Sequence, residues 1–472
     1  MQRTKIVATI GPKTANSKKL KMMYKAGMSV ARLNGSHNTL EWHSNTIKLI
    51  RKILPDFPIL MDIPGKKIRT GSLKHEPKFS ISDEIILTTS KGHDGKNKVS
   101  ITNNLLHKYM SKGDIVLADD GTLKFVVSKV IGRDIYIKAL TKGILKSSKG
   151  INVPHINIGG PLITNRDIGM IEFAKSNDVD FIGISFVESP IHIKKIRKLI
   201  GNHSPYIVAK VENQKGLDNL DNIILEADVI MIDRGDLSTE TNIENLAINQ
   251  KIIIKKANAS STPVIVATEM LDNMITNPFP TKAEVMDISN SIIDGASATM
   301  LSGETAVGNF PVESIKVMSN ISSAIVAKKT VKYKMFNKKT SSLAMGAAIS
   351  NLCTLLPITK VIAITMSGYA AKIVSSQMLS QPIIAVSNDK KVSRALNILS
   401  GTKGVFCNTP FYKDNLDHIP KCLFYLWKKK DIVDDDLILV TALGYPGSGN
   451  RMNLIQTHIV KNLRNLFAWN NI

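Results

Sequence analysis

The chain has 472 residues, of which 43% are hydrophobic and 21% are charged. At roughly 150 residues per domain this length predicts about three domains, and the ordinary composition excludes a small module, a fibrous repeat and wholesale disorder. The net charge of +23 suits nucleic acid, a membrane surface or small anionic substrates. Because the basic residues are scattered and aromatic residues make up only 5%, we expect no nucleic-acid partner.

Cysteine usage and hydropathy indicate the compartment. The three cysteines, Cys353, Cys407 and Cys422, are far apart and show no CxxC spacing, so neither a disulfide framework nor a zinc site is indicated. No apolar run reaches the roughly 18 residues of a membrane span, and the N-terminus leads directly into a strand-like run. We therefore expect a cytoplasmic protein without a membrane partner.

Short apolar, β-branched runs alternate with helix-patterned segments through the first two thirds of the chain, which is typical of parallel βαβ units. Eight strands are predicted, at residues 5–10, 28–33, 59–62, 181–185, 207–211, 229–232, 264–267 and 298–301. Helical spacing lies between most of them, at residues 40–54, 191–200, 243–257 and 283–293. Eight strands with helical returns predict a closed (β/α)8 barrel, the TIM-barrel fold.

The long gap between the third and fourth strands predicts an inserted domain. It contains short alternating runs at residues 84–89, 114–117, 124–130 and 135–140, separated by turn residues, which indicate an all-β domain. Beyond a Lys-rich connection at 329–339, a helix at 343–355 and strands at 361–365, 382–386 and 436–441 indicate a C-terminal α/β domain. We assign residues 1–66 and 156–329 to the barrel, 67–155 to the insert and 330–472 to the C-terminal domain.

The candidate site lies at the carboxyl ends of the barrel strands, where enzymes of this fold place their reactive residues. Arg32, Arg69 and Lys210 form a cationic set suited to phosphate. Glu212 and Asp236 supply oxygen ligands of the kind that Mg²⁺ takes. The short loop around Gly235 offers backbone N–H groups to a carboxylate or phosphate. Together these residues predict phosphoryl transfer, although each one alone could be an ordinary ion pair.

Several motifs give the chain a specific resemblance. They are TKIVATIGP from Thr4, MSVARLNGSH from Met28, IRTG from Ile68, KGINVP from Lys149, VAKVEN from Val208, DRGDL from Asp233, PVIVATEML from Pro263 and MLSGETAVGNFP from Met300. With them the chain resembles the pyruvate kinase family over nearly its whole length. The resemblance implies phosphoryl transfer from phosphoenolpyruvate to ADP, giving pyruvate and ATP in glycolysis. It also implies Mg²⁺ or Mn²⁺ as cofactor and a homotetramer.

The resemblance also assigns roles to individual residues. It implies that Lys210 stabilises the charge of the transition state, that Thr268 or a water it orders relays a proton, and that Glu212 and Asp236 hold the metal. The catalytic residues are Lys210, Arg32, Arg69 and Thr268. The substrate-binding residues are Arg32, Gly235, Asp236 and Thr268. The nucleotide-binding residues are Pro12, Arg32, Asn34, His37 and Lys149, the last carried by the inserted domain acting as a lid.

One departure from the family pattern bears on monovalent cations. Potassium-activated members have a DTKGPEIRTG-like segment, whereas this chain has DIPGKKIRTG, with Lys67 at the position of the glutamate. A lysine ammonium can occupy the place of K⁺, although the residues matching the other potassium ligands, Asn34, Ser36 and Asp62, are present. We therefore predict an activity that does not require potassium.

Two further departures keep alternatives open. ARGDLG is DRGDLS here and ATQML is ATEML, so Asp233 and Glu269 add two carboxylates near the site. Added negative charge weakens the binding of anionic substrates unless nearby bases neutralise it. A divergent barrel enzyme that acts on another enol phosphate or 2-oxo acid is one alternative. A non-catalytic basic binding protein is the other.

Overall fold

The computed structural model describes residues 3–119, 121–154, 156, 161–201, 204–327, 340–411, 415–444 and 452–469. In this part of the chain, eight parallel strands close into a barrel in the order β1-β17-β16-β15-β14-β13-β3-β2. The strands are β1 (Lys5–Thr9), β2 (Val30–Asn34), β3 (Ile59–Ile63), β13 (Phe181–Ile184), β14 (Tyr206–Val211), β15 (Val229–Asp233), β16 (Val264–Ala267) and β17 (Ala298–Leu301). Each begins and ends within two residues of its predicted range, which confirms the (β/α)8 prediction.

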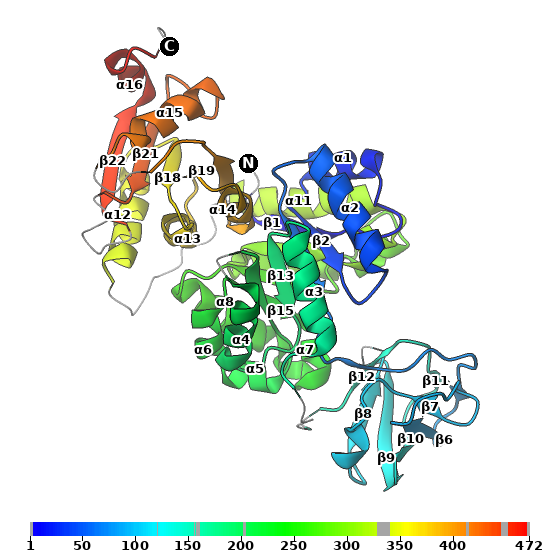
Figure 1. Cartoon of the computed structure of the whole chain (residues 1–472). Coiled ribbons are helices and arrows are strands. Elements are labelled where there is room, and N and C mark those ends of the chain that lie inside the picture. The colour runs from blue at the N-terminus through cyan, green and yellow to red at the C-terminus, as the bar shows by residue number, and fades with distance from the viewer. Residues whose placement is uncertain are drawn as a thin grey trace.

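Helices surround this barrel (Figure 1). They are α1 (Ser17–Ala26), α2 (Leu40–Ile53), α3 (Asn165–Ser176), α4 (Pro190–Ile200), α5 (Gln214–Asp218), α6 (Leu220–Glu226), α7 (Arg234–Glu240), η2 (Ile243–Asn245), α8 (Leu246–Ala259), η3 (Asp272–Ile275), α9 (Lys282–Ile293), α10 (Gly303–Ala306) and α11 (Pro311–Ala327). Side-chain caps define where two of these helices begin. Thr164 before α3 and Thr281 before α9 each form a capping box with the acidic residue three positions later. The helix predicted at 243–257 is instead a 3₁₀ turn followed by α8.

The inserted domain is all-β, as predicted. Its elements are β4 (Ile68–Arg69), β5 (Lys78–Phe79), β6 (Glu84–Thr88), β7 (Val99–Ser100), η1 (Leu106–Lys108), β8 (Ile115–Ala118), β9 (Leu123–Ile131), β10 (Asp134–Ala139), β11 (Gly143–Ile144) and β12 (Gly150–Asn152). In the described residues, seven strands form one sheet in the order β4-β12-β8-β9-β10-β6-β7, and β11 pairs with β5. Since β4 pairs with β12, the chain enters and leaves the insert side by side.

The C-terminal domain is a five-stranded sheet with helices, in the order β20-β19-β18-β21-β22 within the described residues. Its elements are α12 (Ser341–Leu355), β18 (Lys360–Ile364), α13 (Tyr369–Ser376), β19 (Ile383–Ser387), α14 (Lys390–Ala395), η4 (Leu396–Ile398), β20 (Thr402–Phe406), α15 (His418–Lys428), β21 (Leu437–Ala442), β22 (Leu454–Ile459) and α16 (Val460–Leu466). The sequence analysis missed β20 and β22. The Lys-rich connection at 329–339 lies outside the described residues, and the exact domain boundaries stay a prediction.

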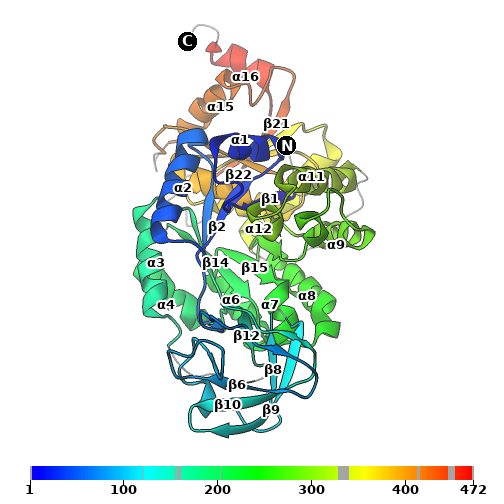
Figure 2. The same ribbon diagram turned by 90° about the vertical axis from the view of Figure 1, so that its right-hand side faces the viewer.

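The insert and the C-terminal domain lie at opposite ends of the barrel, which both views show (Figure 1, Figure 2). The insert follows the carboxyl end of β3. The C-terminal domain contacts the amino ends of the strands, where Arg394 of α14 binds Asp180, the residue before β13, at 2.6 Å. None of the helices in the described part of the chain is long and apolar enough to cross a membrane.

Candidate active site

Lys210 lies at the centre of the charged groups at the carboxyl ends of the strands. Its Nζ atom is 2.8 Å from Glu212, 3.1 Å from Asp233 and 3.4 Å from Asp62, and it donates to the Ser185 hydroxyl at 3.1 Å. Burial lowers the pKa of Lys210, but the three carboxylates outweigh it and hold that pKa well above its ordinary value. The side chain is therefore a fixed, buried positive charge.

Arg32 is locked beside this lysine. Its guanidinium binds Asp62 Oδ2 through Nη2 at 2.5 Å and Nε at 3.1 Å, and it donates from Nη1 to Thr9 at 2.9 Å. Because Arg32 and Asp62 end neighbouring strands β2 and β3, the barrel register alone brings them together. This fork is preorganised, and preorganised guanidinium groups are suited to phosphoryl oxygens.

Three carboxylates gather next to Lys210. One oxygen each of Glu212, Asp233 and Asp236 lies within 4.8 Å of the others. Burial raises the pKa of Glu212 to about 8 and also raises that of Asp236. The Oε1 atom of Glu212 is buried and accepts no hydrogen bond, so its one described contact is the ion pair with Lys210. Buried carboxylate oxygens with unused acceptor capacity fit a divalent cation.

Lys67 contacts this group of carboxylates. It lies between β3 and β4, and its Nζ donates to Asp236 Oδ1 at 2.6 Å. The Oδ1 atom of Asn34 accepts from the backbone of Ser36 at 3.0 Å, and Asp62 is bound by Arg32 and Lys210. The predicted set is therefore divided between two neighbouring clusters, with the ammonium of Lys67 at the carboxylates.

A strained turn follows β16. Thr268 has a φ of +71° and Glu269 one of +53°, conformations that are costly for residues with a side chain, above all a β-branched one. Arg234 holds the turn, donating to the Thr268 carbonyl at 2.6 Å and binding Asp287 at 2.6 Å. The strain aims the Thr268 hydroxyl at α7, where it accepts from Gly235 N at 2.8 Å.

This contact differs from the expectation for Gly235. The sequence analysis places it in a short loop with a free N–H, whereas residues 234–240 form α7 directly after β15. The difference arises because the strand turns into the helix with no intervening residue, so the N–H of Gly235 faces Thr268.

The residues expected to bind nucleotide lie in two places. Pro12 follows β1, Asn34 ends β2, and His37 follows β2 at the same rim. Burial lowers the pKa of His37, and the charges of Arg69 and Arg32 lower it further, which places these cations close to the imidazole. Lys149 belongs to the insert, where its Nζ binds Asp119 at 2.6 Å. The structure therefore brings all but Lys149 to one rim.

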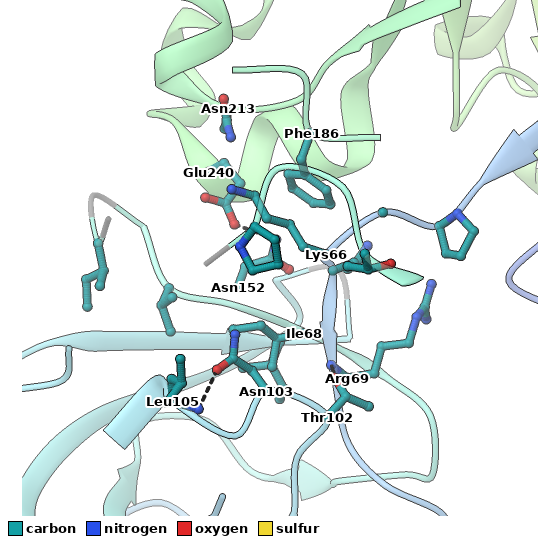
Figure 3. Close-up of a pocket in the computed structure, with 18 of the residues that line it drawn as sticks. Lys66, Ile68, Arg69, Thr102, Asn103, Leu105, Asn152, Phe186, Asn213 and Glu240 are labelled. Atoms are coloured by element: carbon teal, nitrogen blue, oxygen red, sulfur yellow. Dashed lines mark hydrogen bonds between the residues drawn. The ribbon is translucent and has the colours of Figure 1, made fainter. Parts of the chain in front are cut away.

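A cavity of about 420 Å³ opens between the barrel and the insert beside these residues. Phe186, Asn213 and Glu240 line it from the barrel, while Thr102 and Asn103 line it from the insert (Figure 3). Lys66 and Lys67 of the connecting segment and Arg69 of β4 also face it, so its wall carries positive charge.

Sequence reasoning did not assign roles to several residues that support the site. These are Ser185, which binds Lys210; Arg234, which holds the strained turn; and Asn152, which donates to Glu240 at 2.8 Å and so ties β12 to α7. Their partners are 25 to 88 residues away in sequence, and no local pattern indicates such pairs. Only their positions at or beside strand ends could have suggested them.

The barrel, the buried lysine and the carboxylates define a TIM-barrel phosphotransferase. The family model "Pyruvate kinase, barrel domain" matches residues 1–315, and "Pyruvate kinase, alpha/beta domain" matches residues 343–458. The chain belongs to the pyruvate kinase family.

Individual relatives agree. The chain is 37% identical to a pyruvate kinase of Bacillus licheniformis over 98% of this chain and 81% of that protein. It is 36% identical to one of Clostridium perfringens, with 95% and 97% covered. The crystal structure of a pyruvate kinase from Cryptosporidium parvum superposes with a TM-score of 0.85 at 29% identity, covering 97% of this chain and 96% of the other.

Proposed function

We propose that this chain transfers the phosphoryl group of phosphoenolpyruvate to ADP with Mg²⁺ and without a requirement for K⁺. The observation that carries the proposal is the position of Lys210, whose buried ammonium contacts three carboxylates and lies next to the Arg32 fork. A fixed cation in a site shielded from water stabilises the charge that develops during phosphoryl transfer.

The steps of the reaction are then divided among these residues. Arg32 and Arg69 orient phosphoryl oxygens, and the backbone N–H groups of Gly235 and Asp236 receive the carboxylate of phosphoenolpyruvate together with the Thr268 hydroxyl. The Thr268 hydroxyl, held by the strained turn, relays the proton that converts enolate to pyruvate. Pro12, Arg32, Asn34, His37 and Lys149 bind ADP, with Lys149 delivered by the insert.

Glu212 and Asp236 would hold the metal, Mg²⁺ or Mn²⁺. Their fit is supported by buried Glu212, whose Oε1 has the 2.8 Å ion pair with Lys210 but no hydrogen bond, and so keeps acceptor capacity. When bound, a divalent cation neutralises charge on the phosphoryl and carboxylate oxygens. The chain's own part is to keep both side chains buried and close to Lys210.

Potassium independence is supported by Lys67. Its ammonium already supplies a positive charge at the carboxylates, 2.6 Å from Asp236, so a monovalent cation would add a charge that the chain carries itself. Asp62 shares Lys210 with Glu212 and Asp233, which supports an electrostatic role for Lys67 in place of K⁺.

The assay is pyruvate release from phosphoenolpyruvate with Mg²⁺, run with and without ADP. ADP-dependent turnover by the wild type and its loss in Lys210→Met support the proposal. Turnover of another enol phosphate without ADP would favour the divergent enzyme. No pyruvate release by either the wild type or Lys210→Met, with both proteins folded, would favour a non-catalytic binding protein.

We further propose that the chain acts in the cytoplasm as a homotetramer. Exposed apolar side chains on two adjoining outer segments support an oligomer: Ile248 and Ile252 on α8, and Phe279 and Met286 before and on α9. Static light scattering at micromolar concentration tests it, and a mass near 52 kDa, that of one chain, would contradict it.

A further inference from the structure

Asp233 ends β15 beside the two carboxylates proposed to hold the metal. It is 7% exposed, and one of its oxygens lies within 4.8 Å of an oxygen of Glu212 and of Asp236. Its Oδ2 atom is 3.1 Å from Lys210 Nζ. Burial raises the pKa of Asp233, but the ammonium groups of Lys210 and Lys67 outweigh it and bring that pKa below its ordinary value. Asp233 is therefore a third buried carboxylate in this group, ion-paired with Lys210.

Charges at this end of the barrel are out of balance. The contacts described above join the cations Arg32, Lys67 and Lys210 to the carboxylates Asp62, Glu212, Asp233 and Asp236. In this part of the structure the acids outnumber the bases by one. Burial relieves part of this excess by raising the pKa of Glu212 to about 8, and a bound divalent cation would relieve it in turn.

Unused acceptors point the same way. Glu212 Oε1 is buried and accepts no hydrogen bond. The amide oxygen of Asn152, which is 1% exposed, is also without a hydrogen-bond partner in the described structure, although its Nδ2 lies 3.5 Å from Asp236 Oδ1. Carboxylate and amide oxygens are the ligands that hard divalent cations prefer.

Lys67 is positioned over these carboxylates by the hinge of the insert. A Cβ atom on Gly150, the first residue of β12, would lie 2.6 Å from Lys67 Cε, so the missing side chain gives the lysine its path to Asp236. Asp233 and Lys67 are also the two positions where the DRGDL and GKKIRTG segments depart from the family motifs, Ala and Glu. The two departures change charge in opposite directions.

We propose that Asp233 is a third carboxylate of the divalent-cation site and that Lys67 is its counter-ion. This rests on the metal site of the proposed function. A third hard anionic oxygen strengthens cation binding, and it also repels the two anionic substrates. Lys67, bound to Asp236, offsets that repulsion. Asp233 therefore raises the affinity for the metal, and Lys67 limits the accompanying loss of affinity for phosphoenolpyruvate.

The test measures Mn²⁺ binding without substrates, by the electron paramagnetic resonance signal of free Mn²⁺ in potassium-free buffer. Asp233→Asn weakens Mn²⁺ binding by about tenfold or more, because a charged ligand is lost. Lys67→Gln tightens it several-fold, since Asp236 loses a competing cation. The double variant returns to within about threefold of the wild type. Glu269→Gln, which removes the other added carboxylate outside the group of three, leaves Mn²⁺ affinity unchanged.

Wild-type Mn²⁺ affinity in both Asp233→Asn and a second variant, Asp233→Ala, would overturn the proposal, with folding checked by circular dichroism. If Asp233 only pairs with Lys210, its loss lowers thermal stability and leaves Mn²⁺ affinity intact. The phosphoenolpyruvate and ADP assay on the same samples separates the two levels. If the wild type shows no turnover but its Mn²⁺ binding depends on Asp233, only the proposed function is refuted. If the wild type turns over substrate but its Mn²⁺ binding does not depend on Asp233, only this inference is refuted.

Discussion

Asp180, at the amino ends of the barrel strands, and Glu212, at the carboxyl ends, are both buried carboxylates with cationic partners, yet their surroundings differ. Asp180 uses both oxygens: Oδ1 accepts from Arg394 at 2.6 Å, and Oδ2 accepts from Arg51 at 2.7 Å and from Ile59 N at 2.8 Å. Glu212 shares one lysine with two other acids and leaves Oε1 without a hydrogen bond.

The difference separates stability from function. Around Asp180, guanidinium groups saturate the carboxylate and join the barrel to α14, so the charge is structural. Around Glu212, acids exceed bases and acceptors are left over, which costs stability and suits a site that binds cations and anions in turn. Mutations at the amino ends of the strands should therefore lower stability, whereas mutations at the carboxyl ends should lower activity.

The largest expected effect is at Lys210. Lys210→Met removes the ammonium that stabilises transferred charge, so kcat should fall by a factor of about 10³, equivalent to about 4 kcal/mol. Steady-state pyruvate release measures it, with a thermal melt to show that the variant is folded. A kcat within tenfold of the wild type would show that the ammonium of Lys210 is not the main group that stabilises the transferred charge.

Arg394 probes the other end. Arg394→Met takes one of two guanidinium partners from buried Asp180, and we expect about 2–3 kcal/mol less stability with kcat unchanged. Urea unfolding measures the loss. Lys403→Met is the control, because Lys403 binds Asp431 within the C-terminal domain and is half exposed, and it should change stability by less than about 1 kcal/mol. Equal losses in both variants would contradict a special role for burial.

His192 of α4, near the carboxyl ends of the strands, tests how much a buried histidine lowers the free energy of unfolding at acid pH. Burial lowers its pKa to about 4, with the charge of Lys66 adding to the effect. Below pH 6.5 the unfolded chain binds a proton that the folded chain refuses, so stability falls as pH drops toward 4, by about 2 kcal/mol at pH 5.

His192→Gln removes this contribution. Its stability should lose about 2 kcal/mol less than that of the wild type between pH 7 and pH 5, as measured by urea unfolding at both values. His75→Gln, in an exposed position on the insert, is the control and should follow the wild type. Parallel losses in all three proteins would show that other groups cause the acid sensitivity.

The sequence predicted the barrel well because parallel strands buried on both faces are continuous apolar runs, such as Val264–Ala267. It missed β20 and β22, edge strands whose sequences, TKGVF and LIQTHI, mix polar residues and lack this signal. Edge strands are defined by the neighbour they pair with, and composition does not reveal that neighbour.

The residues of the candidate site could be predicted from the sequence, but the contacts between distant segments could not. Strand-end residues and family motifs indicated Arg32, Lys210 and the carboxylates, because barrel register brings such positions together. The contact between Lys67 and Asp236 joins residues 169 apart and depends on how the hinge at Gly150 is packed. Tertiary geometry of this kind leaves no pattern in the sequence, so Lys67 was expected at the Asn34, Ser36 and Asp62 set.

The most direct test of the account compares wild type and Lys67→Glu in saturating phosphoenolpyruvate, ADP and Mg²⁺, with either K⁺ or tetramethylammonium as the monovalent cation. If the ammonium of Lys67 supplies the charge that K⁺ supplies elsewhere, the wild-type rates in the two salts agree within about twofold. The variant is then slow in tetramethylammonium and is rescued by K⁺. Strong activation of the wild type by K⁺ would contradict the account.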